Sequence, residues 1–192
     1  MHTRRLTVFA VLWLSAAAPS LLAATMSIQP TPSAVTAGQV FTLSVEITGA
    51  TDLYGYQFDI GFNPTVLQAT SVTEGAFLGM GGPTIFLPGT IDDVGGTIAD
   101  NADILNGAVS GVNGSGDLLD ITFQALAAGS SSLDIFNLIA LNSFGQGLTV
   151  DTVNATVNVT GSVPAVPEPT TYVLFVTGML GLCAFFRFRP AF

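Results

Sequence analysis

VFTLSVEITGATDLYGYQFDIGF, residues 40–62, is the stretch that decides the fold of this chain. Residues 40–47 alternate apolar and polar side chains, and residues 55–62 do the same. A period of two places successive side chains on opposite faces, which is typical of half-buried antiparallel strands. The turn signal Thr48-Gly49 lies between the two runs. We therefore expect two strands here, with one inward face made of Phe41, Leu43, Val45, Ile47, Tyr56, Phe58, Ile60 and Phe62.

The same alternation continues along the chain. It recurs in residues 118–125 and 152–160, and residues 131–141 form a further apolar strand candidate. Glycine, asparagine and proline clusters separate these runs, and no helix-period segment longer than two turns occurs between them. Eight or nine short strands at this spacing predict one all-β sandwich over residues 25–162. In the last run we expect Val153, Ala155, Val157 and Val159 to share the inner face.

The charge of this middle part is entirely negative. Residues 25–166 hold twelve of the thirteen carboxylates, all but Glu168, and no lysine or arginine. Each carboxylate must therefore be solvated, bonded to backbone, or bound to a cation. Nucleic acid is excluded as a natural partner, because phosphate contacts need lysine or arginine. The charge favours cationic protein surfaces instead.

Residues that commonly carry catalysis are scarce. The single histidine is His2, the single cysteine is Cys183, and lysine is absent. This removes most nucleophilic and acid–base schemes, and any cysteine-based zinc site. Only carboxylates could act, as in a glycosidase, and the sequence does not place such a pair. We expect no enzymatic activity.

One acidic segment is a candidate cation site. Asp92, Asp93, Asp100 and Asp103 lie in IDDVGGTIADNADI, where Asn101 and backbone carbonyls could add further oxygen ligands. Calcium takes six to eight oxygen ligands, so it is the cofactor to consider, although the spacing matches no EF-hand. The alternative is a solvated acidic loop.

Both ends of the chain carry export signals. Arg4 and Arg5 precede an apolar stretch and small residues, which predicts a signal peptide over residues 1–24, cut by signal peptidase after Ala23 or Ala24. An uncleaved anchor is the alternative. A proline-rich linker, residues 163–170, leads to an uncharged run at 171–186. As a helix that run would be about 24 Å long. Arginines follow it on the expected cytoplasmic side, so we expect a transmembrane tail over residues 171–192.

This C-terminal part resembles a PEP-CTERM sorting tail. The resemblance lies in Pro167-Glu168-Pro169, the apolar segment after it, and the closing arginines Arg187 and Arg189. It implies a Gram-negative bacterium that makes extracellular polysaccharide, and cleavage of the tail by an exosortase near the motif. The protein would then be exported to the cell envelope or the extracellular space, with a membrane anchor before processing. A plain C-terminal anchor is the alternative.

The middle part resembles a cohesin domain. The resemblance is carried in order by Gly38, Tyr56-Gln57-Phe58, Asn63-Pro64, Val66-Leu67, Gly75-Ala76-Phe77-Leu78 and the run from Gly116 to Phe123. It implies a jelly-roll β-sandwich of about nine strands, related to cellulose-binding modules. It also implies a non-catalytic module that binds the calcium-loaded dockerin modules of other proteins.

The resemblance is weaker at the expected contact positions. Outward Asn and Asp precede the turn in first-type cohesins, whereas Gly55 and Gln57 stand at the matching places here. Gln57, Asp59 and Tyr54 are the candidate partner-binding residues, although Gln57 and Asp59 could equally be solvated strand residues. The alternative function is binding of an extracellular polysaccharide, or a structural matrix role. Against it, Trp13 lies in the signal peptide, Tyr56 is expected to be buried and Tyr172 lies in the tail. Among the tyrosines and the tryptophan, Tyr54 alone would be free to stack on a sugar.

Overall fold

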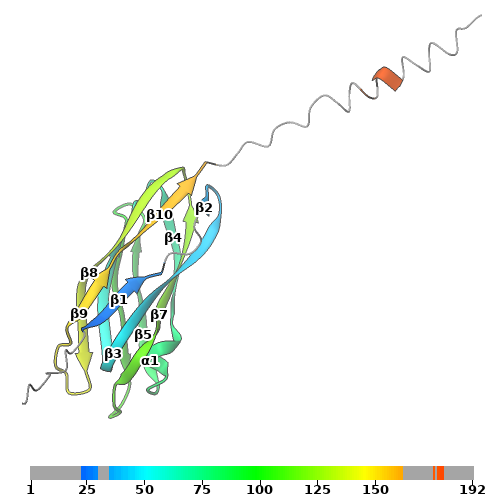
Figure 1. Ribbon diagram of the computed structural model, residues 1–192. Helices are drawn as coiled ribbons and strands as arrows, with labels where there is room; N and C mark the ends of the chain where they lie inside the picture. Colours follow the sequence, from blue (N-terminus) through cyan, green and yellow to red (C-terminus); the bar gives the residue numbers. More distant parts are fainter. Residues whose placement is uncertain (1–22, 30–34, 162–174, 176, 180–192) are drawn as a thin grey trace, which may run out of the picture.

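The computed structural model describes residues 23–29, 35–161, 175 and 177–179. Ten strands and one short helix lie along an elongated domain (Figure 1). In chain order they are β1 (Ala24–Ile28), β2 (Val35–Thr36), β3 (Val40–Gly61), β4 (Leu67–Glu74), α1 (Ala76–Gly79), β5 (Thr84–Asp92), β6 (Thr97–Leu105), β7 (Val112–Ala125), β8 (Gly129–Asn142), β9 (Val150–Val153) and β10 (Ala155–Thr160). The all-β prediction is confirmed.

The long strand β3 belongs to both layers of the sandwich. Its first half pairs with β1 and β7, and its second half pairs with β6 and β8. One layer therefore runs β5-β6-β3-β8-β10-β2, and the other runs β4-β7-β3-β1-β9. Between the halves the register shifts repeatedly, and Gly49 and Asp52 have positive φ values of 71° and 55°. The predicted turn at Thr48-Gly49 is thus a bend within one strand, not a break between two.

Side chains from both halves of β3 meet in the core. All eight residues expected to face inward from residues 40–62 are buried. Phe123 of β7 lies between the halves, stacked on Phe41 with ring centroids 6.0 Å apart and edge-on to Phe62 at 5.5 Å. A fully buried side chain of this size stabilises the fold by about 1.5–3 kcal/mol. The alternation of β3 therefore specifies the interior of the sandwich.

The expectation of a single strand over residues 152–160 is wrong. Asn154 interrupts the run, since its Oδ1 accepts a hydrogen bond from the Ile135 backbone N–H at 3.1 Å and its Nδ2 donates to Asp134 at 2.8 Å. Before it, β9 pairs with β1, and after it, β10 pairs with β8 in the other layer. Val153 is consequently 52% exposed, while Val157 and Val159 are buried as expected.

The predicted export signals fall almost wholly outside the described residues. This applies to the signal peptide, the linker and the sorting tail, apart from Ala23, Ala24 and a few positions between 175 and 179. Ala24 already belongs to β1 and pairs with Val150 of β9. Within the described residues, no helix has the length and apolar character needed to cross a membrane.

Candidate binding face

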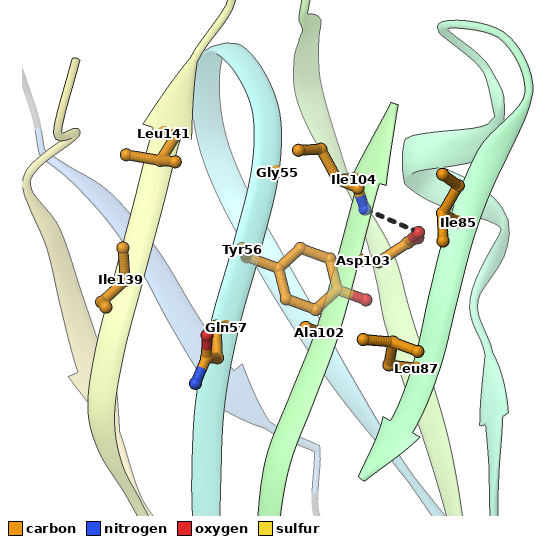
Figure 2. Close-up of a pocket in the computed structure, with 10 residues that line it drawn as sticks. All are labelled: Gly55, Tyr56, Gln57, Ile85, Leu87, Ala102, Asp103, Ile104, Ile139 and Leu141. Atoms are coloured by element: carbon orange, nitrogen blue, oxygen red, sulfur yellow. Dashed lines mark hydrogen bonds between the residues drawn. The ribbon is translucent and has the colours of Figure 1, made fainter. Parts of the chain in front are cut away.

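The outer face of the β5-β6-β3-β8 layer is hollowed. A cavity of about 210 Å³ lies across these four strands (Figure 2). Its lining is mostly aliphatic, and comprises Gly55, Tyr56, Gln57, Ile85, Leu87, Ala102, Asp103, Ile104, Ile139 and Leu141.

Strand register explains the hollow. Two rows of paired residues cross the sheet, and each has a small residue near its middle. The first row is Leu141, Gly55, Ile104 and Ile85, and the second is Ile139, Gln57, Ala102 and Leu87. Gly55 has no side chain, and a Cβ added there would come within 3.0 Å of Ile104. The small residues form the floor, and the aliphatic side chains of β8 and β5 stand on either side.

These aliphatic side chains are unusually open to solvent. Ile85, Leu87 and Ile139 are 51%, 57% and 53% exposed, and Ile104 is 40% exposed. We call Ile85, Leu87, Ile104, Ile139 and Leu141 the apolar groove. Scattered apolar residues are normal on a protein surface, whereas a contiguous patch rimmed by polar groups marks an interaction site.

A polar network closes one end of the groove. Gln57 Nε2 donates to Asp100 Oδ1 at 2.9 Å, and the Asp100 N–H donates to Asp59 Oδ1 at 2.7 Å. Asp59 Oδ2 accepts from Asn137 Nδ2, also at 2.7 Å. We call Gln57, Asp59, Asp100 and Asn137 the acidic rim. Two carboxylates lie in it with no lysine or arginine nearby in the sequence, so this end of the face is negative.

Asp59 also stabilises an irregular part of the sheet. Asp100 and Asn137 have positive φ values of 60° and 54°, on the two strands that flank β3. The registers of β3 with β6 and with β8 both shift beside Asp59. Its two carboxylate oxygens each hold one of these irregular positions. Gln57 and Asp59 therefore lie on the outer face, as the alternation indicated, and are bonded within the sheet.

Tyr54 lies apart from the other two candidates. Its ring packs against the core, and its hydroxyl donates to the Gly107 carbonyl. Tyr54 and Tyr56 are two positions apart along β3, so both rings face the interior side, opposite to Gln57. The expectation that Tyr54 is free to stack on a sugar is therefore wrong.

The four aspartates considered for calcium are not brought together. The segment is a hairpin of β5 and β6 rather than a loop, and its turn contains Asp93. Asp92 Oδ1 accepts from the backbone N–H groups of Gly95 at 2.9 Å and Val94 at 3.0 Å, and these bonds hold the pKa of Asp92 below its usual range. Asp93 Oδ1 instead accepts from the Ala69 N–H at 2.9 Å.

The other two aspartates lie on opposite faces of β6. Asp100 is exposed in the acidic rim, whereas Asp103 is buried between the layers at 1% exposure. Among the residues that the structure describes, no three carboxylate, histidine or cysteine side chains converge on a possible metal position. The segment thus does not form the single calcium site considered from the sequence, because alternation along a strand separates its carboxylates.

The sequence alone did not single out the apolar groove. In residues 85–87 both faces of the strand are apolar, so a period-two analysis cannot assign a core side: Phe86 packs against the core while Ile85 and Leu87 do not. The unbroken apolar run of residues 85–88, on a strand with a free edge, is the signal that could have indicated an exposed apolar surface.

Comparison with known families gives two matches. Residues 25–163, more than half of the chain, match the family model described as the cohesin domain. Residues 165–189 match the model of the PEP-CTERM protein-sorting motif. Among curated proteins, none matches the chain significantly.

Solved structures share the fold at low sequence identity. A non-cellulosomal cohesin from the archaeon Archaeoglobus fulgidus aligns with a TM-score of 0.58 and 18% identity, over 72% of this chain and 92% of that one. A type II cohesin module from a scaffoldin of Acetivibrio cellulolyticus aligns with a TM-score of 0.59 and 18% identity, over 77% and 100%. The cohesin in a type I cohesin–dockerin complex from Clostridium thermocellum gives 0.59 and 10%, over 72% and 100%.

Proposed function

The chain belongs to the cohesin family and carries a PEP-CTERM sorting motif, and on that basis we propose that it binds a dockerin-type protein through the apolar groove and acidic rim. Cohesin domains are non-catalytic binding modules. The binding face has to be argued from this chain itself, because relatives below 20% identity support the fold and not the contacts.

The exposed apolar groove is the observation that carries the proposal. Protein interfaces typically have an apolar centre that is depleted of charge, surrounded by a polar rim. Four aliphatic side chains at 40–57% exposure form such a centre here, and Gln57, Asp59 and Asp100 lie at its edge. The groove lies on paired strands, so it is held rigidly before a partner arrives. A preorganised surface loses less conformational entropy on binding.

The charge of the domain indicates the chemistry of the partner. No lysine or arginine occurs between residues 25 and 166, and two carboxylates stand in the rim. Complementary potentials accelerate encounter and suppress wrong partners. The partner should therefore present an apolar ridge flanked by lysine or arginine. Solved complexes of related cohesins contain dockerins, which supports a dockerin-type module as the occupant.

The sorting motif supports a place at the cell surface. We propose that signal peptidase removes the N-terminal segment and that exosortase cuts near Pro167-Glu168-Pro169. Intact-mass measurement of the mature protein tests this. Loss of the residues that follow the motif is expected, whereas recovery of Phe192 in the mature protein would contradict it.

Binding of defined dockerin modules tests the main proposal. The full chain, immobilised from detergent, is presented with a panel of dockerins from the same bacterium, first with calcium and then with a chelator. Retention of one or more dockerins with calcium, and release with the chelator, is expected. Retention of polysaccharide with no dockerin bound would favour the matrix role instead. The described face offers little for sugar stacking, since the Tyr54 hydroxyl donates a hydrogen bond to the Gly107 carbonyl and its ring packs against the core.

A further inference from the structure

One carboxylate is buried behind the binding face. Asp103 projects from β6 into the sandwich and is 1% exposed. Its Oδ1 accepts a hydrogen bond from the Ile104 N–H at 2.9 Å. Its Oδ2 is also buried and has no donor among the described residues. A buried, unpaired carboxylate oxygen is costly, because the charge has lost its water without gaining a partner.

A second carboxylate lies close to it. Glu74, the last residue of β4, lies within hydrogen-bonding reach of Asp103, and its negative charge acts on the same site. The Thr84 hydroxyl, at the start of β5, donates to Glu74 Oε1. Thr84 therefore fixes one oxygen of Glu74 at the open edge of the sandwich between β4 and β5.

No side-chain cation balances this pair. Lysine, arginine and histidine are absent from residues 6–186, which include every strand. Tyr56 of β3 also faces the pair, and burial, followed by the charges of Asp103 and Glu74, raises the pKa of its phenol. On β7, which pairs with β4, the carboxylates are Asp117 and Asp120, and Asp120 accepts a hydrogen bond from the Ser44 hydroxyl. The helix α1 has no charged residue, and the one carboxylate of β5, Asp92, is the last residue of that strand, at the end away from Thr84. Two carboxylates in contact without a cation cannot both ionise cheaply.

We propose that Glu74 and Asp103 share one proton, and that this proton stabilises the sandwich at the edge where β4 and β5 meet. A proton taken from solvent onto Asp103 Oδ2 turns that oxygen into a donor. It then forms an O–H···O bond to the Glu74 carboxylate. The unpaired oxygen gains its partner, and one negative charge disappears from the contact. This site is separate from the dockerin-type function and does not depend on it.

The burial of Asp103 and its unpaired oxygen both favour the protonated carboxyl. Burial first, and then the charge of Glu74, raise the pKa of Asp103 from its ordinary value of 3.8 to about 6, against a smaller opposing effect of the Ile104 N–H. The folded chain therefore holds a proton that the unfolded chain has released between pH 4 and pH 6. The stabilisation is complete below pH 4 and is lost as the pH rises through 6.

Two readouts test the shared proton. The first is an NMR titration of the full chain in detergent micelles between pH 3.5 and 8, following the Asp103 carboxyl carbon and the Ile104 amide. A common midpoint near 6 is expected in both signals. In Glu74→Gln the midpoint should fall by about one pH unit or more, a tenfold loss of proton affinity. Glu74 is exposed, so this variant retains the fold.

The second readout is the melting temperature. The unaltered chain should melt at a lower temperature at pH 7.5 than at pH 4.5. Asp103→Asn should remove most of that difference, and Glu74→Gln should reduce it, because burial of Asp103 is the larger cause of its raised pKa. Asp151→Asn, an exposed carboxylate on β9, is the matched control and should retain it. Titration of Asp103 below pH 4.5, or an unchanged pH dependence in Glu74→Gln, would overturn the proposal. So would a calcium-induced rise in melting temperature at pH 7.5 that Glu74→Gln abolishes, because the pair would then hold a metal ion.

Discussion

Replacing Tyr56 by phenylalanine removes one buried hydroxyl and leaves the packing intact. The Tyr56 hydroxyl donates to the Leu118 carbonyl at 2.7 Å and so joins β3 to β7 across the core. The side chain is 4% exposed, and its ring stacks on Phe58 with centroids 5.6 Å apart. A phenylalanine ring can keep that stacking, so the variant isolates the hydrogen bond.

The expected loss is moderate because the acceptor keeps a second donor. The Leu118 carbonyl also accepts from the Gly75 N–H at 2.9 Å, so it is not left unpaired. The change therefore costs the net value of one hydrogen bond, about 1 kcal/mol, rather than the larger penalty of an unsatisfied buried carbonyl. Tyr54→Phe is the matched control, since its hydroxyl also donates to a backbone carbonyl but does so in an exposed place. Its cost should be below about 0.5 kcal/mol.

Urea unfolding of the full chain, followed by circular dichroism, measures both variants. With a slope of about 1–3 kcal/mol per molar urea, Tyr56→Phe should lower the midpoint by about 0.3–1 M. Tyr54→Phe should move it by less than half as much. Equal shifts for the two variants would refute the reasoning, because burial would then not distinguish the two hydroxyls.

Three further outcomes are expected. Phe123→Ala should lower the free energy of unfolding by about 3–5 kcal/mol, because it empties the space between Phe41 and Phe62; a loss below 1 kcal/mol in urea unfolding would contradict this packing. Gly96→Ala should lower the free energy of unfolding by about 1–3 kcal/mol or more, because φ is 70° and an added Cβ would lie 2.3 Å from the Phe62 carbonyl oxygen. An unchanged urea midpoint would refute this. Asp52 has its pKa lowered, first by the Ser143 hydroxyl, so its stabilisation is present above pH 3.8 and is lost as the pH falls through its folded pKa. Asp52→Asn should therefore lose less stability than the unaltered chain in an acid-unfolding titration below pH 4, and identical acid slopes would count against the contact.

The alternation of residues 40–62 predicted most of the core of the fold. An apolar residue at every second position leaves only one way to bury a strand, so the inward residues of β3 followed directly. The bend at Gly49 and Asp52 did not follow, because a strand that changes layers has the same local pattern as two strands joined by a turn. Asn154 was missed for a related reason: its polar side chain fits the alternation, yet it bonds to β8 and ends β9.

The binding face depends on information that one strand does not contain. The groove exists because Gly55 and Ala102 occupy the middle of two rows, and those rows are defined by the registers of β3 with β6 and β8. Register between distant strands is a tertiary property. The positions of Asp100 and Asp103 could have been separated from the sequence, because residues three apart on a strand face opposite ways. Treating the segment as a loop concealed this.

The central claim is tested most directly by comparing the dockerin affinity of two variants, one altered in the apolar groove and one altered in the opposite layer of the sandwich. The measurement is the Kd of the full chain for a calcium-loaded dockerin module retained in the capture experiment. Leu87→Asp places a charge in the apolar groove, where the leucine is 57% exposed, and Ser71→Asp places the same charge at an exposed position of β4 in the opposite layer. Leu87→Asp should weaken binding by about tenfold or more, equivalent to about 1.4 kcal/mol, while Ser71→Asp leaves the Kd unchanged. Equal affinities for the two variants, or a loss confined to Ser71→Asp, would contradict the assignment of the groove as the binding face.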